Sequence, residues 1–434
     1  MKKNLLATSL LVLFLTSAFS QDTLKTKWFT AHFQLTCIGQ YHTPFSAKYT
    51  GDNSLQTREN AAVSLTSTLF FGTRLWKGAY IYFNPEIAGG SGLSKTLGVA
   101  GFPNGETFRI GAPEPKVYIA RMYLRQYIAL SKKKIYQEDD ANQVASYIPE
   151  SYFSFVIGRF CVADFFDNNS YAHNPRTQFM NWGLMSNAGW DYPANTRGYT
   201  YGVMLEWMRK NGGIRYGFTV VPKEANGSNM NFNLKQAGSH MLEGEASWNI
   251  KGNRGKIRAL AFFTMANMGN YRLATQMDTP DITSTRKYSR FKYGFGVNAE
   301  QAVNDFIGVF LKGSWNDGAN ETWMFTEIDQ SASAGISLDG KKWKRKHDVV
   351  GLAILVNGIS KQHQNYLAKG GYGFIIGDGK LNYAPEFIAE AFYNIELWKE
   401  RIYVTPDYQF IMNPAYNKDR GPVHAFALRA HVEF

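Results

Sequence analysis

The stretch that decides the fold class runs from Tyr199 to Trp207 and reads YTYGVMLEW. Tyr201, Val203 and Leu205 share the parity of its two aromatic ends, while Thr, Gly, Met and Glu fill the positions between them. A repeat of two residues is the signature of a β-strand, because successive side chains point to opposite faces. One face of this strand therefore meets an apolar medium and the other face a polar one.

A second predicted strand lies upstream, and a long insertion separates the two. The run from Phe153 to Phe160 is rich in β-branched and aromatic residues, which favours a strand over a helix. The insertion from Cys161 to Arg197 is rich in aromatic and asparagine residues. An irregular loop of this length inside a compact domain usually has a function of its own. We expect the two strands to belong to a pore and the insertion to be its loop.

The C-terminal strand shows the same alternation. Apolar side chains recur at every second position from Phe426 to Phe434, and Arg429, His431 and Glu433 occupy the other parity. Such an amphipathic ending with a terminal aromatic residue resembles the assembly signal of bacterial outer-membrane barrels. The resemblance implies that the barrel-assembly machinery binds the strand that ends in Phe434.

Composition excludes transmembrane helices and favours a barrel. After the N-terminal segment no run of about 18 apolar residues exists, which is the length a spanning helix needs. Aromatic residues make up 15% of the chain, glycines number 40 and prolines 14, and the mean hydropathy is −0.31. This mixture suits a membrane barrel, because half of each strand faces lipid and half faces water.

The connections between the predicted strands alternate between long and short. Residues 222–241 form a long connection and residues 251–254 a short one, as in outer-membrane barrels with long external loops and short periplasmic turns. We predict an all-β fold, a transmembrane antiparallel β-barrel of about 16 strands with long external loops folded into the lumen. The connection from Ser131 to Ser151 is long for a periplasmic turn and is the weakest point of this count.

The N-terminus predicts export. Lys2 and Lys3 precede an apolar stretch from Leu5 to Leu15, and a small-residue site ends at Ser20. This order is typical of a secretory signal peptide, so we expect a signal at residues 1–20 and one barrel domain at residues 21–434. The expected location is the bacterial outer membrane, with its lipid as a partner.

The formal net charge of +12 at pH 7 raises the question of an anionic partner. The densest basic cluster runs from Lys341 to Lys346 between two strand patterns, and we interpret it as a solvated turn, with contact to lipid headgroups as the alternative. Nucleic acid is not an expected partner, because an exported chain has little access to it. We expect Cys37 and Cys161 to be unpaired thiols.

No pattern in the sequence predicts an enzyme, a metal site or a cofactor. Two adjacent pairs, Ser239-His240 and His347-Asp348, lack a third orienting group and a nucleophile motif. The eight histidines are dispersed without metal-ligand spacing. Gly294 to Ala299 loosely matches a dinucleotide fingerprint, but it lies inside an alternating strand with no helix after it.

Charged residues recur on one face of the predicted strands. Glu243 and Glu245 share a parity and lie between strands that carry Arg215 and Arg258, which favours a charge ladder in a watery lumen over an acid and base couple. Arg121 and Arg125 share a strand face about 13 Å apart; contact with solute and pairing with lumen carboxylates both stay open for them. The candidates for the lumen are Arg121, Arg125, Glu206, Arg215, Glu243, Glu245 and Arg258.

Four blocks of the sequence resemble the carbohydrate-selective porins of the OprB type. They are Gly158 to Phe160, Asp164 to His173, Phe179 to Trp182 and Trp190 to Tyr199. The resemblance implies a sixteen-stranded outer-membrane barrel through which monosaccharides and related polyols diffuse passively into the periplasm. The alternative is an anion-preferring or general diffusion porin, followed by an outer-membrane enzyme or an adhesive barrel. The oligomeric state stays open.

The resemblance also implies which residues narrow the channel. Aromatic rings can stack on sugar faces, and amide, carboxylate and guanidinium groups can pair with hydroxyls. The candidates in the insertion are Asp164, Asp167, Asn168, Asn169, His173, Arg176, Asn181, Trp182, Trp190 and Tyr192. For Trp182, Trp190 and Tyr192, packing against the inner wall is the favoured role, and contact with sugar stays open.

Overall fold

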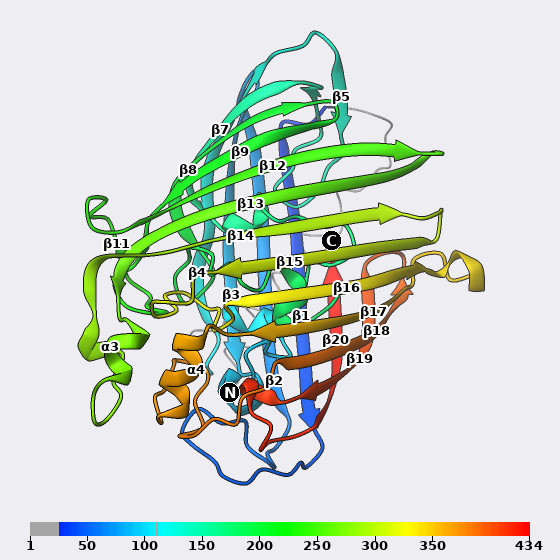
Figure 1. Cartoon of the computed structure of the whole chain (residues 1–434). Helices are drawn as coiled ribbons and strands as arrows, with labels where there is room; N and C mark the ends of the chain where they lie inside the picture. Colours follow the sequence, from blue (N-terminus) through cyan, green and yellow to red (C-terminus); the bar gives the residue numbers. More distant parts are fainter. Residues whose placement is uncertain (1–25, 110–111) are drawn as a thin grey trace, which may run out of the picture.

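A computed structural model describes residues 26–109 and 112–434, and within them sixteen antiparallel strands close into a barrel (Figure 1). The barrel strands are β1 (Phe29–His42), β2 (Ala62–Trp76), β3 (Ala79–Gly90), β4 (Lys116–Ala129), β7 (Tyr152–Phe160), β8 (Thr200–Arg209), β9 (Gly212–Thr219), β12 (Gly238–Ile250), β13 (Asn253–Met268), β14 (Lys287–Ala302), β15 (Ile307–Asn316), β16 (Gln330–Asp339), β17 (Val349–Gly358), β18 (Glu386–Trp398), β19 (Ile402–Met412) and β20 (Val423–Glu433). The predicted fold class and strand number are confirmed.

Short elements decorate the connections between these strands. They are the hairpin strands β5 (Lys134–Gln137), β6 (Ser146–Pro149), β10 (Val221–Pro222) and β11 (Met230–Asn231), the helices α2 (Trp182–Met185), α3 (Tyr271–Thr275) and α4 (Lys361–Ala368), and the 3-10 turns η1 (Leu93–Thr96), η2 (Gly105–Arg109), η3 (Val162–Asp164), η4 (Thr283–Thr285), η5 (Gly340–Trp343) and η6 (Pro414–Tyr416). Figure 1 shows α3 and α4 together at one end of the barrel.

The two faces of each strand meet different surroundings, as the alternation predicts. On β8, Tyr201 and Trp207 are 37% and 43% exposed, whereas Met204 and Glu206 are 0% and 3% exposed. The exposed parity carries the aromatic and apolar residues, and it forms the outer surface of the barrel. The buried parity faces the interior, where polar side chains and inserted loops fill the space.

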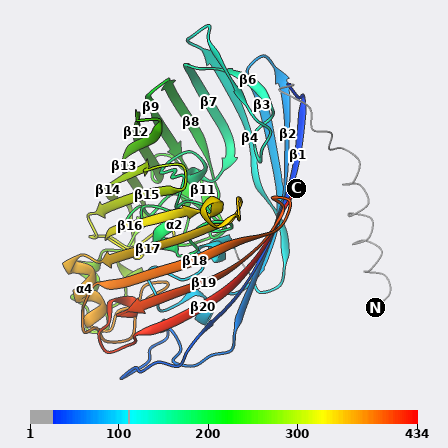
Figure 2. The ribbon, with the colours of Figure 1, turned by 90° about the vertical axis from the view of Figure 1, so that its right-hand side faces the viewer.

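The first and last strands close the barrel. β1 pairs with β20 in antiparallel register, as Figures 1 and 2 show. Phe33 and Phe434 exchange two backbone hydrogen bonds of 2.9 Å each. The alternation at the C-terminus therefore belongs to a barrel strand, and the terminal Phe434 lies at the seam.

The two ends of the barrel differ in their connections. Turns of a few residues join β2 to β3, β8 to β9 and β12 to β13 at one end, and the long connections leave from the other end. The exception is residues 131–151, at the end with the short turns, where β5 and β6 form a separate two-stranded sheet. These residues are a hairpin added to the turn, so their length leaves the predicted count of barrel strands unchanged.

The expected signal peptide at residues 1–20 lies outside the described residues. In the described part of the chain, no helix is long and apolar enough to cross a membrane. Within the described residues, Cys37 and Cys161 are not joined by a disulfide bond, as expected.

Candidate functional site

The connection between β7 and β8 fills the middle of the barrel, and its residues from Cys161 to Arg197 are called the constriction loop here. Strand residues on the inner wall hold it by its backbone. The Glu390 carboxylate accepts the N–H groups of Met180 and Asn181 at 2.5 and 3.0 Å. Lys312 Nζ donates to the carbonyl of Leu184 at 3.0 Å. Because these bonds come from different strands, the loop is fixed across the lumen.

An ion pair fixes the start of the constriction loop. Arg121 on β4 donates from Nε and Nη2 to the two carboxylate oxygens of Asp164, each at 2.6 Å. The guanidinium also lies 5.3 Å from the centre of the Tyr199 ring. Arg121 and Asp164, both predicted site residues, therefore lie together on the lumen side with their charges paired.

The other predicted lumen charges form a continuous ladder on the inner wall. Arg125 pairs with Glu206, and Arg215 pairs with Glu206, Glu243 and Glu245 at 3.1, 2.9 and 3.3 Å. Arg258 then pairs with Glu245 at 2.9 Å and with Glu300 at 3.7 Å. The structure thus brings these predicted residues together. Opposite charges alternate along the ladder, so each arginine is paired with a carboxylate and the ladder joins neighbouring strands.

The polar residues at the first bend of the loop bond mainly to the protein itself. Asp167 has a left-handed backbone with φ of 56°. Its carboxylate accepts the backbone N–H of Asn187 at 2.5 Å and Asn298 Nδ2 at 2.8 Å. Asn169 Nδ2 donates to Asn298 Oδ1 at 2.7 Å, whereas Asn168 is exposed. Asp167 and Asn169 therefore shape the bend and anchor it to β14.

The predicted aromatic residues pack as a cluster inside the loop. Trp182, Trp190 and Tyr192 are each at most 1% exposed. Trp182 stacks on Phe102 at 4.9 Å between ring centres and lies 5.6 and 5.5 Å from Phe108 and Phe325. Phe108 and Phe325 line a cavity, and Trp182 packs against both of these rings.

Three cavities follow one another through the interior of the described barrel. The outer cavity, about 180 Å³, is lined by residues of the long connections such as Lys95, Thr196 and Phe325. The middle cavity, about 210 Å³, shares Phe108 with the outer cavity. The inner cavity, about 550 Å³, shares Gln34 and Asn174 with the middle one. The shared residues show that the three cavities are neighbours in series, and the outer and middle cavities are the smaller ones.

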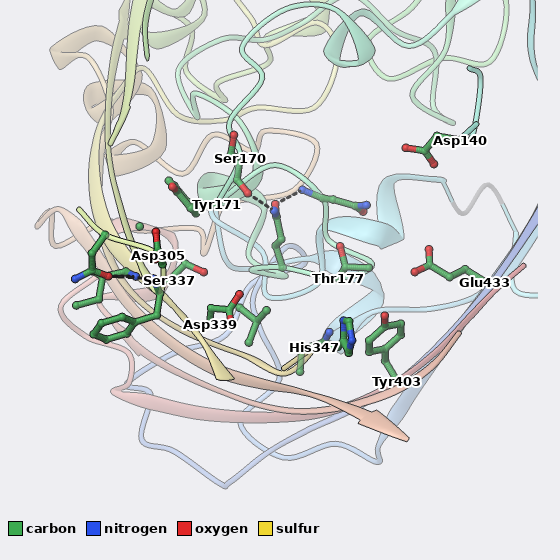
Figure 3. Close-up of a pocket in the computed structure, with 18 of the residues that line it drawn as sticks. Asp140, Ser170, Tyr171, Thr177, Asp305, Ser337, Asp339, His347, Tyr403 and Glu433 are labelled. Carbon is green, nitrogen blue, oxygen red and sulfur yellow. Dashed lines mark hydrogen bonds between the residues drawn. The ribbon is translucent and has the colours of Figure 1, made fainter. Parts of the chain in front are cut away.

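The inner cavity opens at the end of the barrel with the short turns and is polar. Figure 3 shows the carboxylates of Asp140, Asp305, Asp339 and Glu433 around it, with His347 on the same side as Tyr403. These side chains come from turns and strand ends that lie far apart in the sequence. The wide polar mouth allows a hydrated solute to leave the narrow part of the path.

Four predicted site residues line the middle cavity, namely Arg121, Asp164, His173 and Arg176. Arg176 is buried, and its guanidinium pairs with Glu86 at 3.1 Å and with Glu106 at 2.8 Å. Asn181 lies at the N-terminus of α2, where its side chain accepts the N–H of Gly183 at 2.9 Å. Asn181 was predicted to narrow the channel, and in the structure its side chain caps α2.

Other lining residues of the middle cavity were not predicted from the sequence. Phe108 comes from the irregular connection between β3 and β4, and Asn142 comes from the hairpin between β4 and β7. Neither connection has a hydrophobic period, so no sequence signal places these side chains in the lumen. Gln34 lies on the polar parity of β1, a pattern that predicts a lumen face but no particular depth.

Comparisons with known proteins agree with this geometry. The sequence model of a family described as "Carbohydrate-selective porin, OprB family" matches residues 52–434. The structure of Pseudomonas putida OprB at high pH is similar, with 15% identity, a TM-score of 0.67 and 94% of each chain covered. Its low-pH structure has 11% identity and a TM-score of 0.51, covering 100% of this chain and 98% of that one. No protein of curated function matches the sequence.

Proposed function

Because this chain belongs to the OprB family of carbohydrate-selective porins, which places it in the bacterial outer membrane, we propose that monosaccharides and related polyols diffuse through it passively into the periplasm. The observation that carries the proposal is the series of three cavities, which is small in its outer and middle parts, about 180 and 210 Å³, and widens to about 550 Å³ at the inner end. A path of this shape selects solutes by size in its narrow part and releases them into the wide part.

The lining of the narrow part suits a sugar. Phe108 and Phe325 offer rings on which a sugar face can pack, and amide and imidazole groups can exchange hydrogen bonds with hydroxyls. Each such contact is modest in strength, as a channel requires, because a solute that binds tightly leaves slowly.

The charges around the middle cavity favour neutral solutes over anions. Arg121 is paired with Asp164, and Arg176 is paired with Glu86 and Glu106. Both cations therefore have carboxylate partners at 3.1 Å or less, and an anion entering the cavity meets no uncompensated arginine. This pairing disfavours the alternative of an anion-preferring porin.

The family is one of channels, and we propose that the chain has no enzymatic activity. Ser239 and His240 lie on opposite faces of β12, where Ser239 shares a hydrogen bond with Thr264 at 2.8 Å and His240 with Tyr216 at 2.7 Å. In the second adjacent pair, His347 lies 3.3 Å from the exposed Glu400. Neither pair has the nucleophile, base and orienting group that a hydrolase needs.

We propose that residues 1–20 are removed as a signal peptide, that residues 21–434 form the single porin domain, and that the assembly machinery binds the strand that ends in Phe434. N-terminal sequencing of protein taken from outer membranes is expected to begin at Gln21.

Deletion of Phe434 is expected to lower the amount of folded barrel in the membrane, and wild-type levels of folded barrel after the deletion would contradict a role in assembly.

Liposome swelling tests the proposed function. Liposomes that contain the protein are expected to swell quickly in glucose, more slowly in gluconate and least in raffinose, a trisaccharide. Liposomes without protein provide the baseline. Swelling no faster than this baseline in any of the three solutes would contradict a porin, and faster swelling in gluconate than in glucose would support the anion-preferring alternative.

A further inference from the structure

The hairpin of residues 131–151 folds back from the barrel rim onto the inner wall. Val144 is 0% exposed and belongs to the same packed cluster as Tyr80 and Tyr82 of β3. Tyr80 donates its hydroxyl hydrogen to Ser146 Oγ at 2.9 Å. These inward-facing contacts hold the β5–β6 sheet inside the mouth of the barrel.

The segment from Asp140 to Gln143 is called the hairpin tip here, and hydrogen bonds hold it on both sides. Lys27 donates its backbone N–H to the carbonyl of Ala145 at 2.8 Å, and its Nζ lies 2.9 Å from a carboxylate oxygen of Asp139. Asp140 and Gln143 exchange two backbone hydrogen bonds of 3.0 and 2.9 Å. The hairpin tip therefore has a fixed position within the barrel.

The hairpin tip lies where the middle cavity meets the inner cavity. Asp140 lines the inner cavity (Figure 3), whereas the next two residues, Ala141 and Asn142, line the middle cavity. Gln34 of β1 and Asn174 of the constriction loop line both cavities. Three separate elements therefore border the place where the two cavities meet, namely the barrel wall, the constriction loop and the hairpin tip.

The other two sides of this border are held in place as well. Arg176 Nη1 donates to Gln34 Oε1 at 3.1 Å, and Gln34 Nε2 donates to the carboxylate of Glu433 at 3.4 Å. The backbone N–H of Arg176 donates to Asn174 Oδ1 at 3.0 Å. Arg176 thus ties the barrel wall to the constriction loop at this level. Because hydrogen bonds fix all three sides, the border has a defined size.

We propose that the hairpin tip sets, from the periplasmic side, the upper size limit of the solutes that pass between the middle and inner cavities. A solute that has passed the constriction loop meets the hairpin tip next. A turn that only joined β4 to β7 would need neither the added sheet nor the buried contacts of Val144. The proposal rests on the proposed function and deepens it, because it adds a second size-selecting element to the sugar pathway.

Two variants change the size of this border in opposite directions. Replacing residues 134–149 by Gly-Gly removes the hairpin tip and keeps the base, where Lys133 and Glu150 share a backbone hydrogen bond of 2.9 Å and an ion pair of 2.7 Å. Gly-Gly is compatible with a two-residue turn between antiparallel strands. Ala141→Trp instead replaces a methyl group by an indole in the lining of a cavity of only about 210 Å³.

Single-channel conductance in KCl and liposome swelling measure the effect on barrels reconstituted in lipid. The shortened variant is expected to conduct more than the wild type and to admit raffinose at a rate close to that of glucose. Ala141→Trp is expected to conduct less and to lower the entry of glucose to near the protein-free baseline. Lys132→Trp is the matched control, because Lys132 is exposed at the base of the hairpin and lines none of the three cavities. It is expected to leave both measurements unchanged.

Wild-type conductance and glucose entry in Ala141→Trp would overturn the proposal, as would a folded shortened barrel that still excludes raffinose. If the shortened variant does not fold, Ala141→Trp decides alone, because it alters one partly exposed residue and removes no buried contact. Conductance in KCl does not depend on sugar, so it tests the hairpin tip even if glucose does not enter through the wild-type channel. In that case the proposed function fails while the size limit stands, so the two failures are distinguishable.

Discussion

Arg121 holds Asp164 through two parallel hydrogen bonds of 2.6 Å, and this pair joins the wall of the barrel to the first residues of the constriction loop. The pair also lines the middle cavity. Arg125, four residues along the same strand, pairs instead with Glu206 in the ladder and lines none of the three cavities of the path. Two arginines that share a strand face in the sequence therefore have different roles.

Arg121→Ala is expected to make the channel more selective for cations. The substitution leaves the Asp164 carboxylate in the middle cavity without its guanidinium partner, which adds an uncompensated negative charge there. The reversal potential in a KCl gradient measures the change. Arg125→Ala is the control and is expected to shift the potential much less, because Glu206 keeps Arg215 as a partner. Equal shifts in the two variants would contradict the separate roles.

Asp191→Ala is expected to loosen the outer cavity. The Asp191 carboxylate accepts backbone N–H groups from four consecutive residues, 323–326, at 2.8 to 3.2 Å. Loss of hydrogen bonds to a charged group costs about 1.5–3 kcal/mol each, so the segment that carries Phe325 loses local stability of about 3 kcal/mol or more. Amide hydrogen exchange at residues 323–326 measures this loss. The exposed Asp278→Ala is the control, and unchanged protection in Asp191→Ala would contradict the role.

Glu327 is expected to make the contact between two external loops depend on pH, namely the loop between β15 and β16 and the loop between β17 and β18. Burial raises the pKa of Glu327 to about 8, and its carboxyl group accepts the N–H groups of Ile375 and Ile376 at 2.8 Å each. A raised pKa means that the folded state binds the proton more tightly than the unfolded state. The resulting stability is therefore present below about pH 4.5 and is lost as the pH rises to about 8.

Amide protection factors at Ile375 and Ile376, corrected for the intrinsic exchange rate, measure this dependence. They are expected to fall between pH 5 and pH 8 in the wild type and to change less in Glu327→Gln, which cannot ionise. Protection that rises over the same range in the wild type would contradict the raised pKa.

Arg215→Met tests whether the ladder is structural. Arg215 lies within 3.3 Å of three carboxylates on the inner wall, and removing one partner of a buried ion pair costs about 3–5 kcal/mol. Urea unfolding in lipid vesicles is expected to show a loss of this size, while the ratio of glucose to raffinose permeability in the folded fraction stays the same. The exposed Arg254→Met is the control. A changed permeability ratio without a loss of stability would assign the ladder to solute selection.

The barrel strands were predictable because their signal is local. The alternation around Met204 and Glu206 arises because successive side chains of a strand point to opposite faces. Every strand of the barrel has one face toward lipid and one toward the polar lumen, so the same pattern recurs in each strand. The hairpin at residues 131–151 was not predictable as an inner element, because its short strands look like those of any exposed turn. Its position depends on Tyr80 and Tyr82, which are distant in the sequence.

The loop that forms the candidate site could be predicted from the sequence, but its individual lining residues could not. The sequence blocks from Asp164 to Tyr199 indicated the constriction loop, but not which side chains face the cavity. Trp182 and Phe108 are both aromatic, and their different positions depend on contacts between two separate connections. Asn142 has no motif at all, since its place in the lining becomes visible only when the cavity and its other walls are known.

Uptake of labelled glucose into liposomes that contain the wild-type protein tests whether the barrel is a sugar-selective pore. The initial rate is expected to saturate with glucose concentration, because each sugar occupies one narrow cavity in passing. Excess unlabelled glucose is predicted to lower the rate, and the same concentration of raffinose is predicted to lower it far less. A rate that rises linearly with concentration and is unaffected by unlabelled glucose would contradict a sugar-selective pore.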